Sequence, residues 1–175
     1  MPSEYSLYRK IQVVLNIAKA AQLSSWVELK TTVISQRPPN FLTRQYDVKH
    51  DTIVQEVSER SIRKTVNVCR ALGLIDDRGD LTVAGRKAVR QAQFDRVLIT
   101  QVQEFLADKG VEIESLNACV RKSLRAQAVV MPTAFHLWKA CEPDMTLPFF
   151  SQMLTLLSQC GSAESSQRKI YLEFT

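Results

Sequence analysis

Hydrophobic residues recur at helical spacing in the first part of the chain. Over residues 5–22 the apolar positions fall three or four residues apart, with basic and amide side chains mainly between them. Ser25 and Glu28 have the spacing of a capping box, which predicts a second helix over 26–35. Pro38 begins a proline pair that ends this helix.

Residues 51–57 fit two interpretations. Their β-branched content favours a strand, while their position directly before the next helix favours a short helix. We expect a short helix or an extended turn here.

The pattern is clearest over 59–72, where a helix with one apolar stripe is predicted. Ser58 is a favourable N-cap, and Gly73 stands where helices commonly end in the left-handed conformation. The buried stripe is expected to consist of Ile62, Val66, Cys69 and Leu72.

A polar turn follows this helix. Leu74–Ile75 and Leu81–Thr82 are predicted to pair as the strands of a small hairpin around Gly79. Thr82 is then positioned to cap a further helix over 83–93.

The second half of the chain is predicted to be mostly helical. The expected helices cover 94–109, 111–125, a segment starting at Pro132, and 149–160, and residues 168–174 alternate like a strand. This order is compatible with a second winged-helix-like unit in tandem with the first. It is equally compatible with a helical module for dimerisation or partner binding.

Charge is distributed unevenly between the two halves. The chain has a net charge of +5, but residues 1–92 carry +6 and residues 93–175 carry −1. A basic half joined to a near-neutral half suggests that one domain, 1–92, meets a polyanion and the other, 93–175, does something else. An ordinary solvated basic surface is the alternative explanation.

Several classes of protein are disfavoured. No apolar run approaches the roughly 18 residues that a membrane span needs, and the N-terminus does not look like a secretory signal, so we expect a cytoplasmic protein without membrane contact. The four cysteines are scattered away from the two histidines, which argues against a metal site. No phosphate-binding glycine motif or catalytic cluster is evident, so neither a cofactor nor enzyme activity is expected.

The helix over 59–72 carries side chains suited to duplex DNA. Arginine and lysine bind guanine edges and phosphates, and asparagine can pair with adenine. The candidate DNA-binding residues are Arg60, Ser61, Arg63, Lys64, Asn67 and Arg70 on this helix, Arg78 at the tip of the following hairpin, and Arg86 and Lys87 on the next helix.

Residues 51–93 resemble the winged helix-turn-helix domains of transcription regulators. The similarity rests on Ser58–Arg63 opening the helix, Ala71–Ile75 closing it, and Leu81–Thr82 with Gly85 after the turn. The resemblance implies a mainly α fold with small β-hairpins, and double-stranded DNA binding by the helix over 59–72 and the hairpin over 76–80.

A transcription regulator that forms a homodimer through its C-terminal half is therefore the leading hypothesis. The alternative is a non-catalytic accessory subunit of a larger nucleoprotein or defence assembly that uses its winged-helix surfaces for protein contacts. An exposed apolar patch on the C-terminal half would favour that alternative. The residues expected in such a patch are Phe135, Trp138, Phe149 and Phe150.

Overall fold

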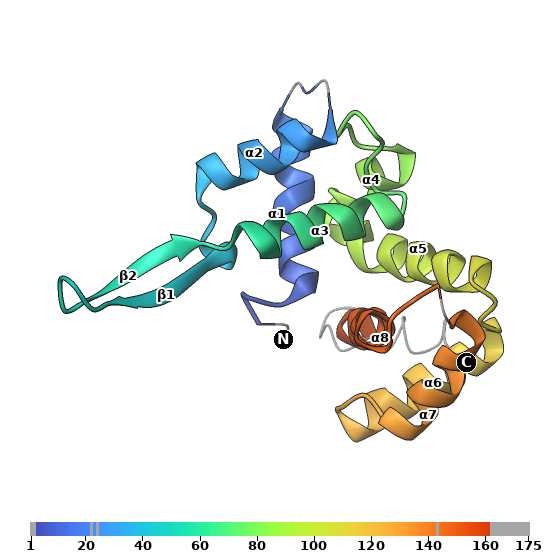
Figure 1. Ribbon diagram of the computed structural model, residues 1–175. Coiled ribbons are helices and arrows are strands. Elements are labelled where there is room, and N and C mark those ends of the chain that lie inside the picture. The colour runs from blue at the N-terminus through green and yellow to red at the C-terminus, as the bar shows by residue number, and fades with distance from the viewer. Residues whose placement is uncertain (1–2, 22, 24, 143, 162–175) are drawn as a thin grey trace. The chain divides into compact units, whose positions relative to one another are not determined.

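The computed structural model describes residues 3–21, 23, 25–142 and 144–161. This part of the chain contains eight α-helices and one two-stranded antiparallel hairpin, which confirms a mainly helical fold with a small β component (Figure 1). It divides into two compact units, Ser3–Val89 and a unit that begins at Arg90. The sequence placed the boundary between residues 92 and 93. The predicted strand over 168–174 lies outside the described residues.

Four α-helices build the first unit: α1 (Leu7–Ala20), α2 (Trp26–Gln36), α3 (Glu59–Ala71) and α4 (Val83–Ala88). Helix α3 packs against both α1 and α2, and α1 also contacts α2 and α4. Apolar stripes of the first three helices meet, together with neighbouring residues of the connecting segments, in a core. Its fully buried members are Ile11, Val14, Leu15, Leu29, Val33, Phe41, Ile62, Val66, Cys69, Leu72 and Leu74. The predicted stripe of α3 is thus buried as expected.

Both ends of α3 follow from local sequence. The hydroxyl of Ser58 accepts a hydrogen bond from the Ser61 amide and caps the first turn. At the other end Gly73 has a φ of 68°, and the amides of Gly73 and Leu74 donate to the carbonyls of Arg70 and Cys69. This paired arrangement satisfies two carbonyls of the last turn of the helix.

The segment between α2 and α3 differs from the prediction. A 3₁₀ turn, η1 (Pro39–Phe41), leads into a hairpin of β1 (Leu42–Asp47) and β2 (Thr52–Val57). The expected helix or extended turn over 51–57 is therefore wrong, and the β-branched residues form a strand. Figure 1 shows this hairpin extending away from α2 and α3.

The two arms predicted to pair after α3 do pair, but only over a short length. Ile75 lies opposite Leu81, the Thr82 amide donates to the carbonyl of Leu74, and the Asp76 amide donates to that of Asp80. The carboxylate of Asp76 accepts hydrogen bonds from the amides of Arg78 and Asp80, which closes the turn. The Trp26 amide donates to the carbonyl of Asp77 at 3.1 Å, so the turn lies against the start of α2.

The second unit contains α5 (Phe94–Asp108), α6 (Ile113–Ala126), α7 (Met131–Trp138) and α8 (Leu147–Gly161), with 3₁₀ turns η2 (Gln91–Gln93) and η3 (Lys139–Cys141). Helix α8 contacts the other three helices. Its fully buried residues are Phe150, Met153, Leu154, Leu156, Leu157 and Cys160. A helix buried on several sides forms the core of a helical bundle.

The predicted helix over 83–93 is interrupted after Ala88, since α4 ends there and η2 follows.

Candidate nucleic-acid interface

One face of α3 is exposed and basic. Arg60, Arg63, Lys64 and Asn67 are all exposed, and their spacing of three, one and three residues places them on a single stripe. Ile62 and Val66 are fully buried on the opposite side. Among the described residues no carboxylate forms an ion pair with Arg60, Arg63 or Lys64. The structure therefore brings together four of the predicted residues as one surface, which we call the α3 stripe.

Ser61 is already engaged within the unit. Its hydroxyl accepts a hydrogen bond from the ammonium of Lys10 on α1 at 2.8 Å. The ammonium also lies 5.6 Å from the centroid of the Phe41 ring, and its partial burial lowers the pKa of Lys10. Sequence reasoning missed Lys10, because it lies among the polar positions of the first helix and gives no local sign of a contact 51 residues away.

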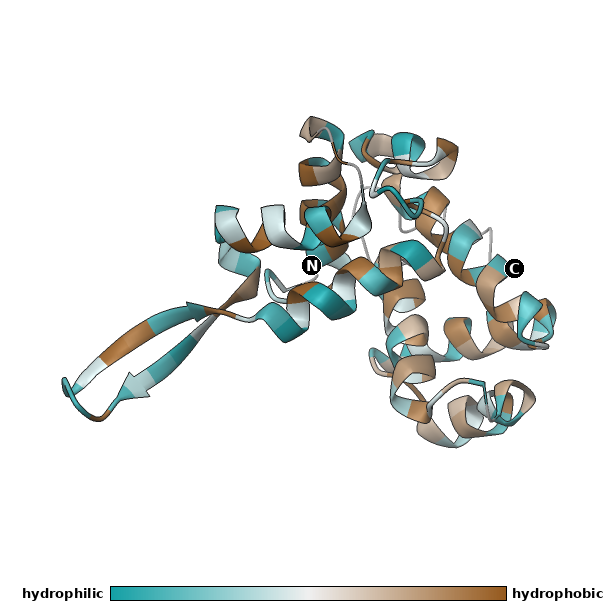
Figure 2. Cartoon of the chain, turned by 45° about the horizontal axis from the view of Figure 1, so that its top comes forward, coloured by the Kyte–Doolittle hydropathy of each residue, from teal (hydrophilic) through white to brown (hydrophobic). Residues whose placement is uncertain are grey.

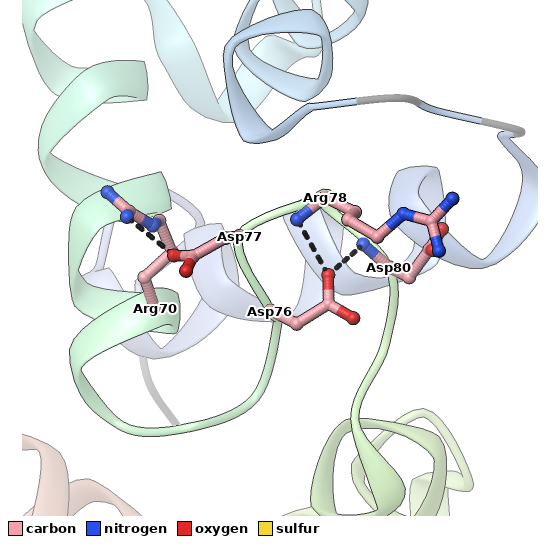
Figure 3. A network of polar contacts seen from close by, with 5 residues as sticks. All are labelled: Arg70, Asp76, Asp77, Arg78 and Asp80. Atoms are coloured by element: carbon pink, nitrogen blue, oxygen red, sulfur yellow. Dashed lines mark hydrogen bonds and ion pairs between the residues drawn. The ribbon is translucent and has the colours of Figure 1, made fainter.

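Arg70 was predicted to contact DNA, but the structure gives it another role. Its guanidinium lies 4.2 Å from the centroid of the Trp26 ring. It also donates to the carboxylate of Asp77 at 2.9 Å (Figure 3). Both partners belong to the unit's own framework, one on α2 and one in the turn that follows α3. Arg70 therefore joins three segments of the unit and is removed from the candidate interface.

Arg78 lies at the tight turn and its side chain is exposed (Figure 3). The resemblance implied DNA binding by the hairpin over 76–80, and in the structure this turn lies against α2. A side chain added at Gly79 would meet the Ser25 carbonyl at 3.1 Å, which shows how closely the two segments approach. Arg78 is consequently placed on a short, supported turn and not on a projecting strand pair.

Arg86 and Lys87 form a separate exposed pair on α4. Thr82 caps this helix by accepting a hydrogen bond from the Gly85 amide at 3.1 Å, as the sequence predicted. The two cations belong to the last turn, where a positive charge complements the helix dipole. They are available for solvent or phosphate, but they belong to a different element from the α3 stripe.

The apolar patch expected on the second unit is smaller than predicted. Phe150 is completely buried and Trp138 and Phe149 are only partly accessible, whereas Phe135 is 43% exposed. Met131, one helical turn before Phe135 on α7, is 45% exposed. The indole of Trp138 donates to the carbonyl of Met145 at 2.7 Å, so this residue supports the fold.

No helix in the described ranges is long and apolar enough to cross a membrane. Across those same ranges, no group of three histidine, cysteine or acidic side chains is arranged to hold a metal ion. Comparison with known proteins gives no match to any protein-family model, curated protein or solved structure.

Proposed function

We propose that the unit Ser3–Val89 binds double-stranded DNA, with α3 in the major groove, and that the protein acts as a transcriptional regulator. The observation that carries this proposal is the α3 stripe. It presents three cations and one amide on the exposed side of a helix whose other side is buried against α1 and α2. A rigidly supported helix with a polar face is the usual means of entering the major groove.

Electrostatics support the same assignment. Between Ser3 and Val89 the sequence has 14 basic and nine acidic residues. Glu59, in the first turn of α3, is the one acidic residue of this helix, and beyond its C-terminal end Asp77 pairs with Arg70 and Asp76 accepts two amides of its own turn. The stripe is thus left with a net positive field that attracts a polyanion.

Each member of the stripe has a chemical role in this proposal. Arg60 and Arg63 each offer a planar pair of donors to a guanine edge or a phosphate. Lys64 neutralises a phosphate as a point charge, and the amide of Asn67 can both donate to and accept from adenine. Arg86 and Lys87 would add backbone contacts outside the groove.

The test is fluorescence anisotropy with a labelled duplex over a range of salt concentrations. Counterion release predicts that the logarithm of the association constant falls linearly with the logarithm of salt, with a slope of about 0.9 per phosphate contacted. Three cations in the stripe predict a slope of at least roughly 2 to 3. The absence of binding at about 50 mM salt contradicts the proposal.

A non-catalytic accessory subunit of a nucleoprotein or defence assembly is the second candidate. It is favoured by the exposed pair Met131 and Phe135 on α7, which lie one turn apart. Such a protein would contact another protein through α7. The same anisotropy series separates the two candidates, because the accessory function needs no salt-dependent affinity for naked duplex.

A further inference from the structure

The hairpin of β1 and β2 concentrates exposed hydrophobic side chains. In the described part of the chain nine large hydrophobic residues are exposed, and four of them belong to this hairpin or its loop: Tyr46 (59%), Val48 (82%), Ile53 (68%) and Val54 (39%). Figure 2 shows the hydrophobic colour mainly on β2, while most of β1 is hydrophilic. Tyr46 and Ile53 lie opposite each other on the two strands and share one face of the ribbon, and a contiguous exposed apolar patch is a mark of an interaction surface.

In the described part of the chain, no third strand pairs with either outer edge of this hairpin. None of its twelve strand residues is buried, and an isolated two-stranded ribbon is only marginally stable in water. Residues 42–57 contain no proline or glycine to interrupt strand pairing. The guanidinium of Arg37 donates to the Gln55 carbonyl and covers part of the β2 edge. The β1 edge is then the better candidate for a partner strand.

The charge of the ribbon argues against DNA as its partner. Over residues 42–57 the two basic residues, Arg44 and Lys49, are outnumbered by the acidic residues Asp47, Asp51 and Glu56. This composition gives a net charge of −1, which does not attract a polyanion. A protein strand with matching side chains fits the hairpin better.

We propose that β1 pairs with β1 of a second copy of this chain, antiparallel and about a two-fold axis at Gln45. In this register Arg44 lies opposite Tyr46 of the second copy, where a cation can contact an aromatic ring. Thr43, whose hydroxyl donates to the Glu56 carbonyl in its own hairpin, lies opposite Asp47 of the second copy, and Gln45 lies opposite itself. Leu42 meets Val48. No pair places like charges opposite each other, and every pair except Gln45 with itself forms twice because the interface is isologous.

Neighbouring registers are less favourable. Moving the axis to Arg44 places two guanidinium groups directly opposite each other, and like charges opposite each other destabilise a sheet. Moving it to Tyr46 leaves Arg44 opposite the apolar Val48. A change of register by one residue would place side chains that share a face in one copy on the opposite face from their partners in the other copy. The self-complementary register centred on Gln45 is therefore the one that the sequence of β1 supports.

This pairing creates a four-stranded sheet from two hairpins, which supplies the strands that one ribbon lacks. Ser58 alone separates β2 from α3, and its amide donates to the carbonyl of Phe41 at the base of the hairpin. A paired sheet therefore relates two α3 helices by two-fold symmetry. The inference differs from the predicted dimer through the C-terminal half, and it does not depend on DNA binding.

The decisive experiment is disulfide trapping of the full chain without DNA. In the proposed register the two Gln45 Cα atoms lie about 5 Å apart, within the range that a disulfide spans. A Gln45→Cys variant is oxidised with glutathione disulfide, and a Thr43→Cys variant is the matched control. Two residues at position 43 would be about 13 Å apart, because four strand positions separate them. The native cysteines in both variants, Cys69, Cys119, Cys141 and Cys160, are all buried.

We expect sedimentation to give a dimer for the unmodified chain, and position 45 to cross-link at least tenfold faster than position 43. Tyr46→Lys puts an ammonium opposite Arg44 and should raise the dimer dissociation constant at least tenfold, while Val83→Lys, an exposed apolar position outside the hairpin, should leave it unchanged. A monomer up to about 100 µM overturns the proposal. Equal cross-linking at 43 and 45, or a dimer that Tyr46→Lys does not weaken, also overturns it. Since no DNA is present, these outcomes are independent of the proposed function.

Discussion

The guanidinium of Arg70 lies over the indole ring of Trp26, 4.2 Å from its centroid, although the two residues are 44 positions apart in the chain. The same guanidinium pairs with Asp77. One side chain therefore connects α3, α2 and the turn that follows α3. This relationship separates the basic residues of α3 into those that face outward and one that holds the unit together.

Replacement of Arg70 by alanine should lower the free energy of unfolding by about 1 to 2 kcal/mol. The loss combines a partly desolvated cation–π contact with a partly exposed ion pair, of which the latter contributes less. Urea unfolding of the variant and the parent measures this difference in the free energy of unfolding. Arg63→Ala, an exposed change on the same helix, should stay within roughly 0.5 kcal/mol of the parent. If Arg70→Ala leaves stability unchanged but abolishes duplex binding, the assignment of Arg70 to the framework is wrong.

Reversal of two charges in the α3 stripe should separate binding from folding. The double variant Arg63→Glu and Lys64→Glu is expected to weaken duplex affinity at least roughly thirtyfold, because it removes two phosphate or base contacts and adds repulsion. Anisotropy at fixed salt measures the change, and circular dichroism verifies folding. The double variant Lys122→Glu and Arg125→Glu makes the same charge change on exposed positions of α6 and serves as control. Equal losses in both double variants would indicate a nonspecific charge effect.

Gly85→Ala should be strongly destabilising. A methyl group at this position would lie 2.0 Å from the carbonyl oxygen of Leu74, which is backbone and cannot rotate away. Overpacking of this kind predicts a loss of roughly 2 to 4 kcal/mol, seen as a lower melting temperature. Val83→Ala in the same helix is the control, since Val83 is 64% exposed and its truncation should matter little. A melting temperature that matches the parent would contradict the close approach of α4 to Leu74.

The thiol of Cys69 should resist labelling in the folded protein. Complete burial raises its pKa to about 12, so at pH 8 only roughly one thiol in ten thousand is ionised. In the unfolded chain the thiol has its ordinary pKa, near 9, so the protonated thiol of Cys69 is favoured more strongly by the folded state. Its contribution to stability is therefore complete below about pH 9 and is lost as the pH rises from about 9 towards 12. Reaction with an aromatic disulfide reagent, in native buffer and in urea, measures the protection. Rapid native labelling at Cys69, located by mass spectrometry, would show that it is accessible.

Local sequence determined the boundaries of α3 and the caps of α2 and α4. Ser25, Ser58 and Thr82 each accept a hydrogen bond from the amide three residues later, and Gly73 adopts a positive φ at the end of α3. These interactions connect residues that are close in the chain, so residue type and spacing are enough to predict them. The exposed stripe was predictable for the same reason, because helical periodicity places Arg60, Arg63, Lys64 and Asn67 on the side opposite the apolar positions.

The prediction for residues 51–57, which include β2 of the hairpin, was wrong because it relied on the fold expected around them more than on their own residue types. The β-branched residues of 52–57 favoured a strand, and the opposite prediction followed from the helix expected before Ser58. Pairing with β1 decided the matter, and that pairing needs a second segment that the periodicity of 51–57 does not reveal.

By itself, therefore, the sequence determined most of the helices, the caps of α2, α3 and α4, and which face of α3 is basic. Only the tertiary structure decided that Arg70 stacks on Trp26, that Lys10 donates to Ser61, and that the turn over 76–80 lies against α2. Caps and stripes depend on hydrogen bonds and periodicity within a few residues. A side chain's partner across the core depends on how the helices pack, which no local pattern encodes.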